Sequence, residues 1–154
     1  MKTSHVHDHD QVIARWARAG MAFGVRPASR SPDLERLLLE TARIAPSDAR
    51  LFTMVVTWLS RFDTLVARHR LRRLIIDELE PQHRPVLGVL LDFARRETGR
   101  DRFNAAIEAC RLSRLPDPQP LFDSERQNPA ARRLAEQKAL DISRTWNLWV
   151  RRVE

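Results

Sequence analysis

Apolar residues recur at helical spacing along most of the chain, and the clearest stripe follows the helix-start signal Pro46-Ser47-Asp48. Its members lie three or four residues apart on one helical face: Leu51, Met54, Val55, Trp58, Phe62, Leu65 and Val66. Such a stripe predicts an amphipathic helix with that face in the core. His69 extends the stripe and is expected to be buried, and the stripe changes phase after it. We therefore predict a break between two helices near Arg70.

Further stripes, with local start and stop signals, predict the remaining helices. Their expected ranges are residues 11–23, 31–44, 71–79, 85–98, 101–110 and 129–143. Asp101 and Asn128 carry the short polar side chains of N-terminal caps, and Gly99 is a typical helix stop. Residues 1–10 are predicted to be a mobile tail, and residues 11–154 a single domain. The predicted fold is therefore all-α, a single compact bundle of six to seven helices.

The last residues of the chain fit two structures. In a strand, Trp146, Leu148 and Val150 would lie on one side. In a helix, residues 146–153 would continue the preceding segment poorly. However, no partner strand is evident elsewhere, and the three prolines of residues 116–120 indicate an extended loop. We favour a helix here, with a short C-terminal strand as the alternative.

The composition is that of a folded protein outside a membrane. Of 154 residues, 43% are hydrophobic and 31% are charged, which fits a globular rather than a disordered chain. No apolar run approaches the roughly 20 residues of a membrane span, and the polar residues 1–10 lack the apolar region of a signal peptide. Cys110 is the only cysteine, which excludes an internal disulfide. These features favour a cytoplasmic protein with no membrane partner.

Positive charge narrows the classes of partner. The formal net charge is +7, and the isoelectric point is about 11.2. Of the 27 lysine and arginine residues, only Lys2 and Lys138 are lysines. An arginine guanidinium is a planar fork of donors that matches phosphates and carboxylates. We therefore expect a polyanion or an acidic protein as the partner; a GC-rich genome is the alternative explanation for the excess of arginine.

The densest basic segment spans residues 68–73. With its flanking arginines it supplies the candidate nucleic-acid-binding residues Arg61, Arg68, Arg70, Arg72, Arg73 and Arg84. Phosphate contacts from such residues give sequence-independent affinity. Residues 71–97 could also form a helix-turn-helix, although the usual glycine of the turn is missing. The alternative is a solvated, salt-bridged surface around Asp77, Glu78 and Glu80, whose pKa values the surrounding arginines should lower.

A second basic set lies near the C-terminal end. It consists of Arg144, Arg151 and Arg152, interleaved with Trp146 and Trp149. Arginine with tryptophan is typical of a stacking surface for single-stranded nucleic acid and equally of a protein–protein hot spot. We assign the three arginines to nucleic-acid binding and the two tryptophans to a partner anchor. The alternative is that both tryptophans pack into the core.

Histidine and cysteine give little evidence for a metal or a cofactor. Residues 5–10, His-Val-His-Asp-His-Asp, would place metal-ligand types on one side of an extended strand. Ordered sites draw ligands from several elements, so we interpret this segment as a tail with adventitious metal affinity. Cys110 falls on an apolar helical face and is expected in the core, whereas His83 could titrate near neutral pH. We therefore predict no metal site and no cofactor.

Catalytic motifs are absent from the sequence. It has no Walker-type glycine loop and none of the patterns G-x-G-x-x-G, H-E-x-x-H and G-x-S-x-G. The leading hypothesis is a non-enzymatic, small basic nucleic-acid-binding protein: a regulator, an antitoxin-like component or a ribonucleoprotein subunit. It would contact DNA or RNA phosphates through arginine-rich helical faces. The rival hypothesis is a helical interaction or scaffold module that binds an acidic protein partner or forms a homo-oligomer.

Overall fold

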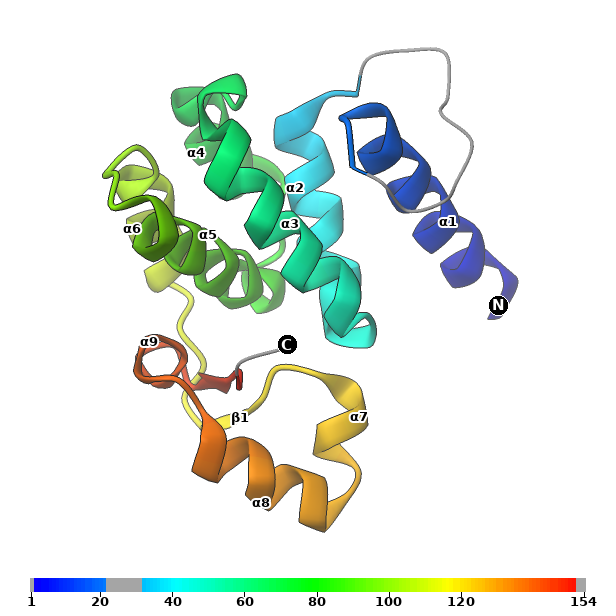
Figure 1. Cartoon of the computed structure of the whole chain (residues 1–154), viewed down its shortest axis with the longest axis vertical. Coiled ribbons are helices and arrows are strands. Elements are labelled where there is room, and N and C mark those ends of the chain that lie inside the picture. The colour runs from blue at the N-terminus through cyan, green and yellow to red at the C-terminus, as the bar shows by residue number, and fades with distance from the viewer. Residues whose placement is uncertain (1, 22–31, 152–154) are drawn as a thin grey trace.

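The computed structural model describes residues 2–21 and 32–151 (Figure 1), and within these ranges it contains nine α-helices and one pair of short strands. The helices are α1 (Lys2–Arg18), α2 (Leu34–Ile44), α3 (Ala49–Phe62), α4 (Arg68–Glu78), α5 (Arg84–Thr98), α6 (Asn104–Arg111), α7 (Asp123–Arg126), α8 (Pro129–Lys138) and α9 (Asp141–Arg144). The predicted all-α class is confirmed. The predicted count of six to seven is too low because α7 and α9 are single four-residue turns, too short to show a periodic pattern.

Three helices begin at polar caps that the sequence displays. The side chains of Asp33, Asp48 and Asn128 accept hydrogen bonds from backbone N–H groups in the first turns of α2, α3 and α8. Each cap satisfies a donor that has no partner within its helix. The predicted cap at Asp101 is wrong, because α6 begins after Phe103 without a side-chain cap. Gly99 ends α5 in the left-handed conformation, as predicted, with φ of 67°.

Helix α1 begins at Lys2, so residues 2–10 form a helix rather than the predicted tail. Its Trp16 is fully buried and donates Nε1–H to the hydroxyl of Thr41 on α2 at 2.8 Å. The same indole packs edge-to-face on Trp58 of α3, with ring centroids 5.1 Å apart. His9 Nε2 lies 2.7 Å from Asp48 Oδ2. These long-range contacts, which no local pattern reveals, anchor α1 to the rest of the fold.

The break after α3 comes earlier than predicted. Helix α3 ends at Phe62, a 3-10 turn, η2, spans Asp63–Leu65, and α4 begins at Arg68. The turn is held by a distant residue, because the Arg102 guanidinium donates to the carbonyls of Asp63 and Val66 at 3.0 and 2.6 Å. Phe62 and His69 are consequently exposed, and the expectation that both are buried is wrong.

Helix α5 forms the centre of the core. Residues 85–92 are all buried, and the helix packs against α2, α3 and α6. Cys110 of α6 is fully buried beside it, as predicted, and this burial raises the pKa of its thiol to about 12. No helix in the described ranges is long and apolar enough to cross a membrane.

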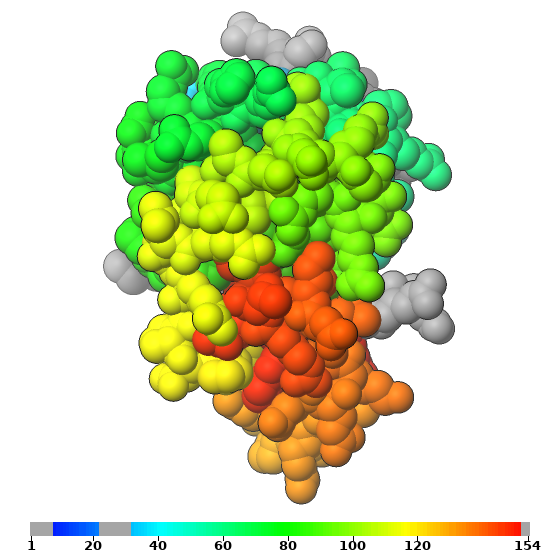
Figure 2. Space-filling view, turned by 90° about the vertical axis from the view of Figure 1, so that its left-hand side faces the viewer, coloured from blue at the N-terminus to red at the C-terminus, as the bar shows by residue number. Residues whose placement is uncertain are grey.

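The C-terminal part (residues 119–151) contains the strand pair. Strand β1 (Gln119–Pro120) pairs in parallel with β2 (Leu148–Trp149), so the preference for a C-terminal helix is wrong and the alternative strand is correct. The partner strand lies in the proline-rich segment, for which the sequence predicts an extended loop. Helices α7, α8 and α9 lie between the strands in sequence. In Figure 2 this part of the chain, yellow to red, lies below α5 and α6.

Candidate nucleic-acid interface

Helix α4 presents an exposed basic surface. Arg68 and Arg72 are one helical turn apart, as are His69 and Arg73, and all four side chains are exposed. Residues four apart lie on the same side of a helix. None of the three arginines has an ion pair or hydrogen bond from its side chain to any residue that the structure describes. We call Arg68, Arg72 and Arg73 the α4 arginines; they are the part of the predicted basic segment that can meet a phosphate.

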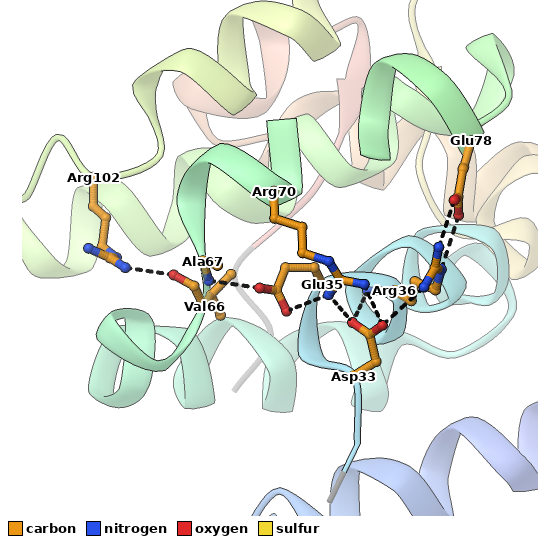
Figure 3. A network of polar contacts seen from close by, with 8 residues as sticks. All are labelled: Asp33, Glu35, Arg36, Val66, Ala67, Arg70, Glu78 and Arg102. Carbon is orange, nitrogen blue, oxygen red and sulfur yellow. Dashed lines mark hydrogen bonds and ion pairs between the residues drawn. The ribbon is translucent and has the colours of Figure 1, made fainter. Parts of the chain in front are cut away.

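Arg70 points the other way, toward α2 (Figure 3). Its guanidinium donates to both oxygens of Asp33, at 2.5 and 2.6 Å, and lies 3.4 Å from a carboxylate oxygen of Glu35. The hydrogen bond from Arg70 lowers the pKa of Asp33 to about 2. Glu35 also accepts from the backbone N–H of Ala67, just before α4. Arg70 therefore holds α4 to α2, and its guanidinium is already paired with carboxylates of this fold.

Arg84 also has a structural role. Its guanidinium donates to the carbonyls of Leu79 and Ile76, at 2.9 and 3.2 Å, where α4 ends. These carbonyls have no partner further along the helix. Arg84 thus caps the C-terminal end of α4 and does not belong to the exposed basic surface.

Glu78 and Glu80 are paired with arginines of α2 rather than with the α4 arginines. Arg36 donates to both carboxylate oxygens of Glu78, at 2.8 and 3.2 Å, and Arg43 likewise to those of Glu80, at 2.9 and 3.2 Å. The hydrogen bonds from these arginines lower the pKa values of Glu78 and Glu80. For these two glutamates the direction agrees with the prediction. The partners differ from those expected, and the α4 arginines consequently remain uncompensated by these two acids.

A helix-turn-helix is contradicted by burial. The second helix of such a motif must lay exposed side chains in a groove of DNA. In this protein that helix would be α5, whose residues 85–92 are buried. A second 3-10 turn, η3 (Pro81–His83), connects it to α4. The exposed element is α4 itself, which Figure 2 shows in green at the top, next to α6.

Arg61 lies apart from the α4 arginines. It is exposed in the last turn of α3, where it lines an open groove between α3 and α5 together with Arg96. It has no ion pair in the part of the chain that the structure describes. Arg61 therefore remains a candidate anion-binding residue, but it belongs to this groove and not to the surface of α4.

The second basic set does not form a stacking surface. Trp146 is fully buried and Trp149 is 9% exposed, so both assignments as partner anchors are wrong and the core alternative is correct. Arg144 donates to the carbonyl of Glu136 at 2.5 Å, and Arg151 pairs with Glu125 at 3.3 Å. Arg152 lies outside the described residues. The indole rings of Trp146 and Trp149 are packed inside the protein, and the sequence pattern does not reveal this burial.

No group of three or more potential metal-ligating side chains occurs among the residues searched, those that the structure describes. Within the described ranges, the polar contact of His9 outside α1 is with Asp48. His83 is half-buried, and desolvation lowers the pKa of its imidazole. The arrangement can therefore supply cations for anion binding, and the described ranges contain no cluster of metal-ligating side chains.

No protein-family model matches the chain, and no curated protein or solved structure is significantly similar to it. Its function must therefore be argued from the side chains themselves.

Proposed function

We propose that this protein binds nucleic acid without catalysing a reaction on it, through phosphate contacts from the α4 arginines. The observation that carries the proposal is the contrast within one helix. Arg70 is bound to Asp33 and Glu35, whereas the three neighbouring arginines are exposed and have no side-chain partner in the described ranges. Three guanidiniums on one exposed face match a row of phosphates.

The positive end of α4 strengthens the same surface. Arg68 and His69 lie in its first turn, which contains no acidic residue. The N-terminus of a helix carries a partial positive charge that favours anions. The surface offers few groups that discriminate between bases, so we expect weak sequence preference. A regulator, an antitoxin-like component or a ribonucleoprotein subunit would each use such binding, and a reducing cytoplasm fits the single buried cysteine.

The test is binding of purified, nuclease-treated protein to labelled duplex DNA, single-stranded DNA and RNA, titrated from about 50 to about 200 mM salt. Replacing Arg68, Arg72 and Arg73 together with alanine should weaken binding at least about tenfold at low salt. It should also reduce the log–log salt slope on duplex DNA by about 2 to 3, because each lost phosphate contact removes about 0.9.

A matched control removes three exposed positive charges elsewhere: Arg50, Arg133 and Lys138. This control variant should keep most of the affinity if α4 is the site. Circular dichroism and thermal unfolding check that both variants are folded. Equal losses in the two variants would show that only net charge matters, and the α4 site would be abandoned.

A protein partner is the second candidate, and two exposed apolar residues favour it. Ile76, one turn after Arg72 on α4, is 44% exposed, and Leu112 after α6 is 85% exposed. Arg84 bonds both the Ile76 carbonyl and the hydroxyl of Ser113, which places these two positions near each other. Apolar side chains beside arginines fit an acidic protein partner or a second copy of this chain. Absence of nucleic-acid binding at about 50 mM salt would favour this candidate.

A further inference from the structure

An open groove of about 620 Å³ lies between α3, α5 and the C-terminal part of the chain. Its apolar lining consists of Phe52, Val56, Phe93, Leu140 and Val150. The rings of Phe52 and Phe93 meet edge-to-face, with centroids 6.1 Å apart. Pockets of a few hundred cubic ångströms with mostly apolar walls and few polar groups are typical of small-ligand sites.

The charged groups of the groove are mainly cationic. Arg61 and Arg96 are exposed, and neither has a side-chain partner among the residues described. Arg151 also lines the groove, but it pairs with Glu125 at 3.3 Å. Glu97 is the only acid in the lining. Two guanidiniums are therefore available to a ligand from adjacent helices.

The hydroxyl groups of the groove cannot replace the arginines as donors. Thr53, Thr57 and Ser60 donate their hydroxyl hydrogens to backbone carbonyls one turn earlier in α3, at 3.1, 3.0 and 2.8 Å. A hydroxyl has one donor hydrogen, so these three side chains can only accept from a ligand. Among the described lining residues, Arg61 and Arg96 are the arginines without a carboxylate partner, so they are the cations most available to an anionic head.

We propose that this groove binds a small organic anion with an apolar aryl or alkyl body and a single phosphate or carboxylate head. The apolar walls would contact the body of the ligand, and the two guanidiniums would bind its head through charge-assisted hydrogen bonds. This site is separate from the α4 arginines and does not depend on the proposed nucleic-acid binding.

The first experiment titrates the intact protein with 8-anilinonaphthalene-1-sulfonate, which has an aryl body and one anionic head. We expect saturable binding at one site, with amide NMR shifts that map to α3 and α5. Replacing Arg61 and Arg96 with alanine should weaken binding by at least about tenfold, because each charged hydrogen bond is worth that much or more. Thr57→Glu, an exposed substitution that adds a negative charge, should also weaken it. The Arg50→Ala and Arg133→Ala double variant is the charge-matched control and should bind as the wild type does.

Competition distinguishes the two sources of such an anion. Displacement of the probe by decanoate indicates an alkyl carboxylate, and displacement by adenosine monophosphate indicates a nucleotide. Failure of both to displace it would overturn the proposal. Equal probe affinity in the wild type, the Arg61/Arg96 variant and Thr57→Glu would overturn it as well, whatever the outcome for nucleic acid.

Discussion

The indole ring of Trp146 occupies the space that a side chain on Gly88 would need. An ideal Cβ at position 88 would lie 2.3 Å from Cη2 and 2.4 Å from Cζ3 of Trp146. The same indole donates Nε1–H to the buried carboxylate of Asp92 at 3.0 Å, one turn further along α5. The Arg111 guanidinium lies 4.9 Å from the ring centroid. A glycine and an aspartate four residues apart thus fix the C-terminal part of the protein on α5.

Gly88→Ala should destabilise the protein, although alanine is the better helix former. The gain in helix propensity is about 1 kcal/mol, but overpacking against a rigid indole ring costs about 1–3 kcal/mol. We expect a net loss in the free energy of unfolding, measured by urea denaturation. The same substitution in a Trp146→Phe background should be neutral or stabilising, because phenylalanine lacks the outer ring that clashes. Stabilisation by Gly88→Ala in the wild type would contradict the contact.

The parts of the fold that depend on local signals could be predicted from the sequence. Asp48 and Asn128 are recognisable as caps because their side chains bond backbone groups two or three residues away. The strand pair could not be predicted, because Gln119 and Leu148 meet across a long stretch of intervening chain. The break at η2 depends on Arg102, which lies far along the sequence. Contacts of this kind override local propensity and leave no trace in a sequence window.

The ion pair between Arg70 and Asp33 should make the stability of the protein depend on pH in the acid range. The hydrogen bond from Arg70 lowers the pKa of Asp33 from 3.8 to about 2. The stabilisation is therefore fully present above pH 3.8 and is lost as the pH falls toward 2. Both side chains are partly exposed, so screening by solvent keeps this stabilisation small. Carbon-detected NMR titration should show the low pKa in the wild type and a value near the ordinary one in Arg70→Gln.

The pKa of Glu125 is shifted in the opposite direction from that of Asp33, so its effect on stability should have the opposite pH dependence. Its side chain is 8% exposed, and neither carboxylate oxygen has a hydrogen-bond partner in the structure. Burial raises the pKa of Glu125, and the positive charge of Arg151 only partly opposes this. A raised pKa means that the folded state binds the proton more tightly, so this group stabilises the fold as the pH falls through that pKa toward 4.5.

Glu125→Gln should therefore stabilise the protein at pH 7 by up to about 1 kcal/mol, since the buried charge is removed. The advantage should shrink near pH 4, where the wild-type carboxyl is protonated. Unfolding curves at several pH values measure both effects. The control is Glu136→Gln on the exposed face of α8, which should show little pH dependence. A destabilised Glu125→Gln at pH 7 would show that the pair with Arg151 outweighs the cost of burial.

Only the composition of the candidate site could be predicted from the sequence. Arginines that are neighbours in the chain differ in environment because a helix turns them in different directions: Arg70 faces the acids of α2, and Arg72 faces solvent. Which acids neutralise which arginines also depends on packing, as the pairs of Arg36 and Arg43 with α4 and the following turn show. The burial of Trp146 and Trp149 likewise depends on the assembled fold, so the sequence pattern alone does not predict it.

Arg72 and Arg70 should differ in their effects on nucleic-acid binding. Arg72→Ala should weaken binding and reduce the magnitude of the salt slope on duplex DNA by about 0.9, because one phosphate contact is lost. The comparison is the double variant Arg70→Gln with Asp33→Asn, which leaves the net charge unchanged and keeps a good helix cap at position 33. It should remove the ion pair and leave both the affinity and the salt slope as in the wild type.

The reverse result, an unchanged salt slope in Arg72→Ala and a reduced one in the double variant, would mean that Arg70 leaves Asp33 to contact the nucleic acid. The NMR titration of Asp33 in the complex would then show its pKa returning toward the ordinary value. If Asp33 keeps its low pKa in the complex, Arg70 remains a structural residue, and the binding surface is limited to the exposed side of α4.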